Sequence, residues 1–315
     1  MTIGGHLEEL YGLPALTFPG PGETPRELPE PDAVAWRITA DTYDADERWT
    51  EAFARFCSAV DTTRVRALVV GAWEDAYERS SGDVVEALVA ARDRLPGLRS
   101  LFLGDMVYEE AEISWITQSD VTPLLSAFPA LEEIGVRGGQ GLEFPALRHD
   151  SLRKLVVETG GLPVGVVRGV AAGELPALEH LDLWLGTSWY GADSEAADLA
   201  PILSGARLPR LRHLALRNSD IQDEIAAAVA AAPVVAGLDS LDLSMGTLSD
   251  DGGAALLSGQ PLTHLRALDL GHHFMSEEMT RRVREALGPH IQDLGLTPAR
   301  RSEYRPEERY VAVGE

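Results

Sequence analysis

Two aspartates, Asp242 and Asp269, occupy the same place in two copies of a repeated sequence, LDSLDL and LRALDL. If these copies form neighbouring strands, the two carboxylates lie about 4.8 Å apart, which is one strand spacing. Carboxyl groups this close raise one another's pKa and could act as an acid and a base. Because an open sheet excludes little water, catalysis by this pair is a secondary hypothesis. The favoured interpretation is a patch that meets an Arg or Lys of a partner.

Other residues with catalytic or metal-binding potential lack the further residues that such a site requires. Cys57 is the single cysteine, which excludes an internal disulfide, and the helical spacing of WTEAFARFCSAV predicts a buried structural thiol. His272 and His273 are adjacent, so their side chains point to different sides of a strand, and a zinc site needs further ligands. The acidic run at 41–47 lacks the central glycine of a calcium loop. We expect no metal and no cofactor.

The net charge limits the class of partner. The 315 residues include 27 basic and 50 acidic side chains, a formal net charge of −23. Such a surface repels phosphate backbones and anionic lipid, so we expect neither nucleic acid nor membrane as a partner. A basic protein partner is electrostatically permitted, although acidity also serves solubility alone. The sequence shows no signal peptide and no long apolar run, and we expect a cytoplasmic location.

The residues with chemical potential lie in a repeat. A hexamer with the spacing L-x-x-L-x-L returns along the chain in steps of 21 to 33 residues. Its copies begin at Val65, Leu98, Leu131, Leu152, Leu178, Leu211, Leu238, Leu265 and Ile291, with a weaker first copy near Val34. An amphipathic helical segment follows most copies, as at 223–232, 251–258 and 276–287. Most of these helices are predicted to start behind a capping side chain: Ser81, Ser119, Asp223, Asp250 or Ser276.

This pattern resembles the leucine-rich repeat, and the steps near 27 residues resemble its long, ribonuclease-inhibitor-like subtype. The resemblance implies an α/β fold: a right-handed solenoid or horseshoe of about nine or ten strands. Its parallel sheet would line the concave face and its helices the convex face. The ERYVAVGE and ITQSDVTPLL segments also look like a family of small bacterial cytoplasmic leucine-rich repeat proteins without an established biochemical role. The asparagine that usually follows the strand is mostly replaced by glycine here, with Asn218 near its place.

The expected organisation is one domain over residues 1–315. Residues 1–60 would form an N-terminal cap that includes the weak first repeat, residues 61–297 the repeats, and residues 298–315 a C-terminal cap. The C-terminal cap is predicted to cover the last strand, with Tyr310 and Val311 packing onto it. The oligomeric state is left open.

Strand alternation predicts which side chains leave the core. The leucines of each hexamer turn inward, and the residues between them turn onto the concave face. The concave-face candidates for partner binding are His180, Asp182, Trp184, His213, Arg217, Asp242 and Asp269.

Aromatic residues are expected on the loops at one rim of the sheet. The candidates are Tyr108, Trp115, Trp189 and Tyr190, and the small RGGQG and ETGG segments between them suggest a notch with aromatic walls. Tyr and Trp are common anchors of protein interfaces, but such rings can equally pack loops onto the rim.

The function expected from these features is non-enzymatic: a protein-binding scaffold or inhibitor that uses its concave face. Two other classes stay open. One is an accessory subunit that presents a substrate in a bacterial multi-enzyme pathway. The other is a degenerate enzyme that uses the Asp242 and Asp269 pair.

Overall fold

The fold is a single curved sheet with helices on one side. The computed structural model describes residues 3–23, 27–301 and 307–315. Within this part of the chain, twelve strands follow one another in sequence order, and each is hydrogen bonded to the next. The strands are β1 (Glu9–Leu10), β2 (Leu13–Thr17), β3 (Ala35–Ile38), β4 (Ala67–Val70), β5 (Ser100–Leu103), β6 (Glu133–Arg137), β7 (Lys154–Glu158), β8 (His180–Gly186), β9 (His213–Ser219), β10 (Ser240–Asp242), β11 (Ala267–Asp269) and β12 (Asp293–Gly295). Only β1 and β2 pair antiparallel.

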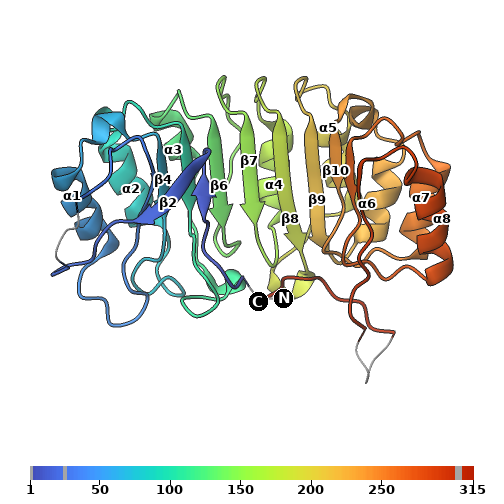
Figure 1. Ribbon diagram of the computed structural model, residues 1–315, viewed down its shortest axis with the longest axis horizontal. Helices are drawn as coiled ribbons and strands as arrows, with labels where there is room; N and C mark the ends of the chain where they lie inside the picture. Colours follow the sequence, from blue (N-terminus) through green and yellow to red (C-terminus); the bar gives the residue numbers. More distant parts are fainter. Residues whose placement is uncertain (1–2, 24–26, 302–306) are drawn as a thin grey trace.

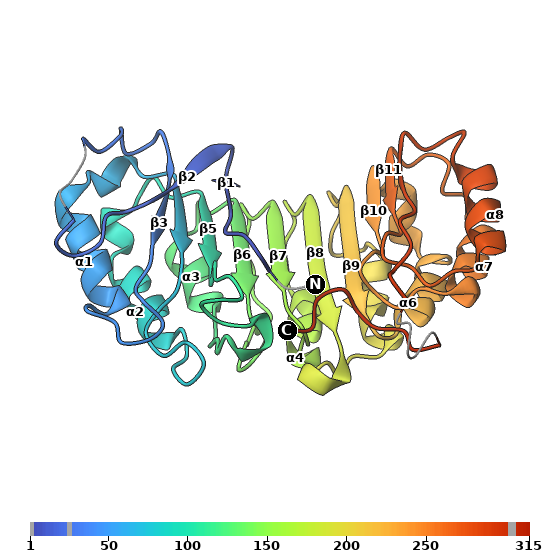
Figure 2. The same ribbon diagram turned by 60° about the horizontal axis from the view of Figure 1, so that its bottom comes forward.

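The helices form the second layer. The described residues contain α1 (Trp49–Ala59), α2 (Gly82–Ala90), α3 (Thr122–Ala127), α4 (Val164–Ala172), α5 (Ala200–Leu203), α6 (Gln222–Val229), α7 (Asp250–Ser258) and α8 (Glu277–Leu287). Figures 1 and 2 show the two layers curving together, with α1 and α8 at opposite ends of the arc. Among the described residues, no helix is both long and apolar enough to cross a membrane.

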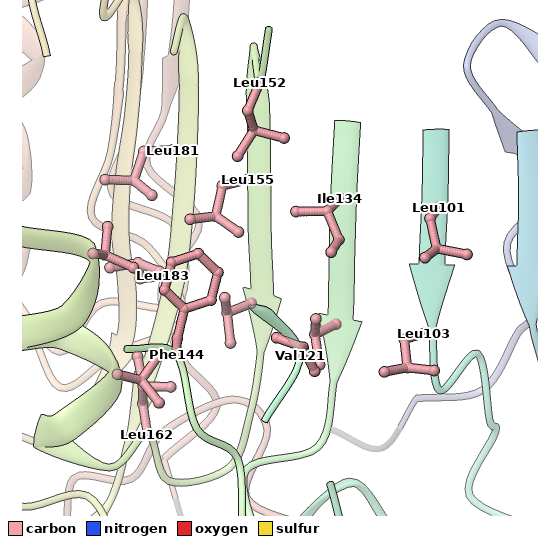
Figure 3. Close-up of a cluster of buried hydrophobic side chains, with 14 of the residues drawn as sticks. Leu101, Leu103, Val121, Ile134, Phe144, Leu152, Leu155, Leu162, Leu181 and Leu183 are labelled. Atoms are coloured by element: carbon pink, nitrogen blue, oxygen red, sulfur yellow. The ribbon is translucent and has the colours of Figure 1, made fainter. Parts of the chain in front are cut away.

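The repeated leucines form the core between the layers. Leu101, Ile134, Leu155 and Leu181 are successive register partners on β5 to β8, and none is more than 1% exposed. Figure 3 shows these side chains in line, with Phe144 packed beside them. Burying each such side chain contributes about 1.5–3 kcal/mol, so the repeat supplies the main stabilising term.

The helix starts agree only in part with the predicted caps. Ser276 caps α8 by accepting a hydrogen bond from the Met279 amide at 3.1 Å. Asp223 does not cap its own helix, because α6 already begins at Gln222. Its carboxylate instead accepts the Ser249 and Gly252 amides at the start of α7. The side chain therefore joins two neighbouring repeats.

The N-terminal segment adds two strands to the ten strands of the repeat. β2 pairs parallel with β3 and so covers the first edge of the repeat sheet. A tight turn at Tyr11 and Gly12, both with positive φ (58° and 70°), folds β1 back onto β2. We call residues 3–17 the N-terminal strap.

The C-terminal tail (residues 307–315) does not lie along β12, contrary to the cap prediction. It runs back across the ends of earlier strands (Figure 2). The Tyr310 ring packs on His272 and Phe274, and the Ala312 amide donates to the Met245 carbonyl at 2.7 Å. Val313 reaches Asn218 at the end of β9. The apolar run Val311–Val313 is buried there, which accounts for the direction of the tail.

Candidate functional site

The candidate site lies on the sheet face that carries the residues between the repeated leucines, which we call the open face. Its register is the one that the sequence predicts. Asp182 pairs with Ala215, Ala215 with Asp242, and Asp242 with Asp269. His180 likewise lies beside His213 on the next strand. The two terminal segments then divide this face into regions of different character.

The apolar end of the open face lies under the N-terminal strap. Ala35, Ala67 and Val69 on β3 and β4 are fully buried, and Leu10 and Leu13 of the strap pack against them. Without this cover, an apolar patch would face water. The strap therefore completes a second, small core on the opposite side of the sheet from the helices.

A buried ion cluster fixes the strap in place. The Asp105 carboxylate is fully buried and accepts hydrogen bonds from Arg37 Nε at 2.8 Å and Arg137 Nη1 at 3.2 Å. It also accepts the backbone amide of Leu7, whose carbonyl in turn accepts from Arg37. Arg137 is paired further with Glu158 at 2.8 Å. Buried charges of this kind persist only when every partner is present.

The C-terminal tail is held by Asn218. This residue has a left-handed φ of 57°, a conformation that asparagine tolerates better than most side chains. Its amide group donates to the Val313 carbonyl at 2.6 Å and accepts the Val313 amide at 3.0 Å. The side chain thus imitates a strand backbone and binds the tail as a strand would.

The tail also fills the predicted notch between the aromatic loops. Ser114 Oγ donates to the Gly314 carbonyl at 2.5 Å, and Gly314 packs beside the Tyr190 ring. A Cβ atom at Gly160 would lie 2.4 Å from that same carbonyl oxygen. The absence of a side chain at Gly160, in the ETGG segment, therefore makes room for the C-terminal tail.

Two candidates that we expected to be exposed are buried, one of them beneath the tail. Trp184 and Asp182 project onto the open face, as alternation requires, but they are only 7% and 5% exposed. Trp184 packs with Ile113, Ala312 and Val313. The sequence pattern places both side chains correctly but carries no signal that a segment over 100 residues away covers Trp184.

Asp182 is the inner member of an ion cluster. Its carboxylate accepts Arg217 Nε at 3.0 Å and Nη2 at 2.5 Å, and Arg217 Nη1 lies 3.2 Å from Asp242. Burial raises the pKa of Asp182, against the opposing effect of Arg217. Burial lowers the pKa of Arg217, but the two carboxylates outweigh this and raise it. The guanidinium also lies 5.1 Å from the centre of the Trp184 ring.

The two histidines of the open face stack on each other. The ring centres of His180 and His213 are 3.9 Å apart and the rings are nearly parallel, at 12°. Burial lowers the pKa of His180 to about 3, with further lowering by His213, Lys154 and Arg217. Burial also lowers the pKa of His213, whose Nδ1 is hydrogen bonded to Ser240 Oγ at 2.6 Å. Both rings are therefore neutral at neutral pH.

A pocket of about 530 Å³ lies between the strap and the middle of the sheet. Its sheet side carries Lys154, His180 and His213 together with Val156. Leu10 and Tyr11 of the strap form the opposite wall. We call this space the strap pocket. Its lining is partly polar and partly apolar, as in pockets that bind small ligands.

Beyond the pocket the open face is acidic. Asp242, Asp269 and Asp293 come from three successive strands, β10, β11 and β12, and we call them the acidic strip. Asp269 and Asp293 are exposed, and neither has an ion-pair partner among the described residues. The neighbour of Asp269 on β12 is Gly295, where a Cβ would lie 2.2 Å from the Asp269 carboxylate. The glycine leaves that carboxylate accessible.

The predicted aromatic rim is partly exposed. Trp189 is 91% exposed, Trp115 55% and Tyr108 45%, whereas the Tyr190 hydroxyl donates to the Glu315 carboxylate. A groove of about 800 Å³ runs between Trp189 and residues 308–312 of the tail. The rim therefore contains both of the expected cases: rings free for contact and a ring that packs the chain's own tail.

The residues that could bind a metal stay apart. Within the described ranges, no three His, Cys, Asp or Glu side chains are placed to hold an ion. His273 is buried, while His272 is hydrogen bonded to the Tyr310 carbonyl at 2.9 Å. Cys57 is buried on α1, and burial raises the pKa of its thiol.

Three parts of the site were not selected from the sequence. The Asp105 cluster joins arginines from different repeats, and no local spacing marks it. Lys154 is the register neighbour of His180, and the sequence signal for it is that it is the only lysine. The strap had a signal as well, because Gly12 follows a short apolar run and begins another.

Comparison with known proteins supports the fold alone. No protein-family model matches the sequence, and no curated protein matches it. A solved structure of a protein from Bacteroides fragilis, determined by a structural genomics consortium, is similar with a TM-score of 0.72. The two chains share 24% identity, and the match covers 85% of this chain and 73% of the other.

Proposed function

We propose that this chain is a non-enzymatic binding protein that holds a basic segment of a partner protein on its open face. In this proposal the fold is a right-handed leucine-rich repeat horseshoe of the ribonuclease-inhibitor-like kind, and the open face is its concave face. The hexamer repeat and the uninterrupted strand order support the assignment. A cytoplasmic location belongs to the same proposal.

The acidic strip is the observation that carries this function. Asp269 and Asp293 are exposed carboxylates without ion-pair partners in the described chain, on a face that a glycine keeps open. The whole chain adds a net charge of −23, which would accelerate the approach of a cationic partner. Arginine or lysine side chains of that partner would form ion pairs with Asp269 and Asp293 when it binds.

The exposed aromatic rim supports a protein partner over a small cation. Trp189 lies almost fully exposed beside its groove, and large exposed aromatic side chains are frequent hot spots of protein interfaces. The basic segment would lie on the strip and a neighbouring apolar part of the partner against Trp189.

Catalysis by the aspartate pair has less support. Asp242 already lies 3.2 Å from Arg217 and accepts the Ser244 amide at 2.8 Å. Asp269 accepts the Gly271 amide at 2.7 Å and is open to water. The two carboxylates are register partners, but neither is enclosed as a catalytic acid or base normally is.

A peptide-binding experiment tests the proposal. Fluorescence anisotropy with a labelled arginine-rich decapeptide should give saturable, salt-sensitive binding. The double variant Asp269→Asn, Asp293→Asn should weaken it about ten-fold or more. Because any loss of negative charge weakens long-range attraction, the matched control is Glu277→Gln, Glu285→Gln on α8, which has the same net charge.

Two results would contradict the proposal. Equal weakening by the two double variants would mean that only net charge matters. Unchanged binding in the Asp269→Asn, Asp293→Asn variant would exclude the acidic strip. In cells, the partner that co-purifies in stoichiometric amount should be lost in this variant and kept in the α8 control.

A further inference from the structure

The strap pocket contains a cation that forms no hydrogen bond or ion pair within the part of the chain that the structure describes. Lys154 is the only lysine of the chain and lines the pocket from β7. Among the described residues, its ammonium group has no hydrogen-bond or ion-pair partner. Its register neighbours are Glu133 on β6 and His180 on β8.

The carboxylates on the sheet side of the pocket are already engaged. Glu133 accepts from Ser100 Oγ at 2.9 Å, and Glu158 is paired with Arg137 at 2.8 Å. Asp182 and Asp242 share Arg217. The remaining carboxylate of the lining, Glu9, is on the exposed strap. The ammonium of Lys154 therefore keeps its hydrogen-bond donors free among the described residues, although its charge acts on Asp182 and its register neighbour is Glu133.

The neighbouring His180 and His213 rings are neutral and add hydrogen-bonding groups, not charge, to the pocket. The charges that act on His180 are those of His213, Lys154 and Arg217, and all of them oppose its protonation. The ring stays neutral and keeps one N–H that it can donate. A bound anion beside it would be stabilised by Lys154 and by this N–H, and it would raise the pKa of His180 in return.

We infer that the strap pocket binds a small organic monocarboxylate, with its charged group beside Lys154 and His180. An ammonium with free donors can pair with one carboxylate, whereas a phosphate dianion would meet about twice the repulsion from Glu133 and Asp182. Val156 on the floor and Leu10 on the strap supply an apolar surface for the rest of the molecule. A volume of about 530 Å³ suits a ligand larger than acetate.

Calorimetric titration with four probes tests this inference. Phenylacetate should bind at neutral pH with saturable heat, while the neutral phenylacetamide and the cation phenethylamine should bind about ten-fold more weakly or not at all. Inorganic phosphate should bind more weakly than phenylacetate. No saturable binding of phenylacetate, or equal binding of phenylacetamide, overturns the inference. Tighter binding of phosphate would overturn the assignment to a monocarboxylate.

The variant Lys154→Met should weaken phenylacetate binding at least about ten-fold. Arg282→Gln is the matched control, because it removes one exposed cation from α8 and leaves the same net charge. Unchanged affinity in Lys154→Met, or equal loss in the control, excludes a site at Lys154.

Histidine ring signals in the unmodified protein give an independent measurement. NMR spectra should show that phenylacetate shifts the His180 and His213 signals and that phenethylamine does not. Because Asp269→Asn, Asp293→Asn changes no residue of the pocket lining, it should keep phenylacetate binding. Failure of the carboxylate site and failure of the basic-partner proposal are therefore distinguishable.

Discussion

The open face has two halves that share the same backbone repeat. The chain covers one half with its N-terminal strap and leaves the other exposed. On β3 and β4 the open-face side chains are apolar, apart from Arg37 of the Asp105 cluster, and the N-terminal strap covers them. On β11 and β12 the face carries Asp269 and Asp293 of the acidic strip, and both carboxylates stay exposed. Hydration explains the difference, since apolar groups gain by being covered and unpaired carboxylates lose. Stability should therefore depend on the first half and recognition on the second.

The largest effect should come from removing the charge at the centre of the covered half. Asp105→Ala leaves Arg37 and Arg137 buried without their shared carboxylate and should cost about 3–5 kcal/mol of unfolding free energy. Urea unfolding measures this. Asp269→Ala, the comparison from the exposed half, should change the same quantity by less than about 0.5 kcal/mol. Similar costs for both variants would remove the distinction between the halves.

Lowering the pH should reduce the stability of the protein through His180, which lies between the two halves of the open face. The pKa of His180 falls from an ordinary 6.5 to about 3 on folding, so the unfolded chain binds the extra proton first. The resulting stability is complete above pH 6.5 and is lost as the pH falls toward 3, by roughly 2–4 kcal/mol. His180→Phe should flatten this part of the stability profile. His290→Gln, at an exposed histidine, should leave its slope unchanged, and a slope equally steep in His180→Phe would contradict the assignment.

A smaller effect is expected where the C-terminal tail is attached. Asn218→Asp removes the amide donor to the Val313 carbonyl and should destabilise the tail by about 1–3 kcal/mol. Hydrogen exchange at the Val313 amide should accelerate, while exchange in β5 stays slow. Asn218→Gly, which keeps the left-handed backbone but not the side chain, should accelerate it too. Unchanged exchange in both variants would mean that Asn218 does not hold the tail.

The smallest effect on stability should belong to the acidic strip. Asp269→Asn, Asp293→Asn should alter the unfolding free energy by no more than about 0.5 kcal/mol, since neither carboxylate has an ion pair to lose. A thermal unfolding curve checks this. Destabilisation well above that value would show that the strip has a structural role.

The fold was predictable because its signal is local and repeated. Each hexamer carries its own inward leucines, so the strands and their register follow without any knowledge of distant residues. The register of Asp182, Asp242 and Asp269 followed for the same reason. The weak copy near Val34 is confirmed as β3.

The burial of the site was not predictable, because it comes from segments outside the repeat. Trp184 and Asp182 were placed on the correct face, but Val313 covers Trp184 through a hydrogen bond to Asn218 that spans 95 residues. The Asp105 cluster likewise joins Arg37 to Asp105 across 68 residues. Periodicity describes neighbouring repeats and contains no information about contacts of this length.

The attachment of the tail also determines the order in which contacts form while the chain is synthesised. Repeat neighbours lie 21 to 33 residues apart, so each strand can pair soon after it leaves the ribosome. The bond from Ser114 to Gly314 spans 200 residues and has to wait until Gly314 has been synthesised. Until then, Trp184 and Ile113 lack the cover that Ala312 and Val313 provide. A nascent chain halted before residue 311 would present these two side chains to chaperones, and the addition of Val311–Val313 covers them.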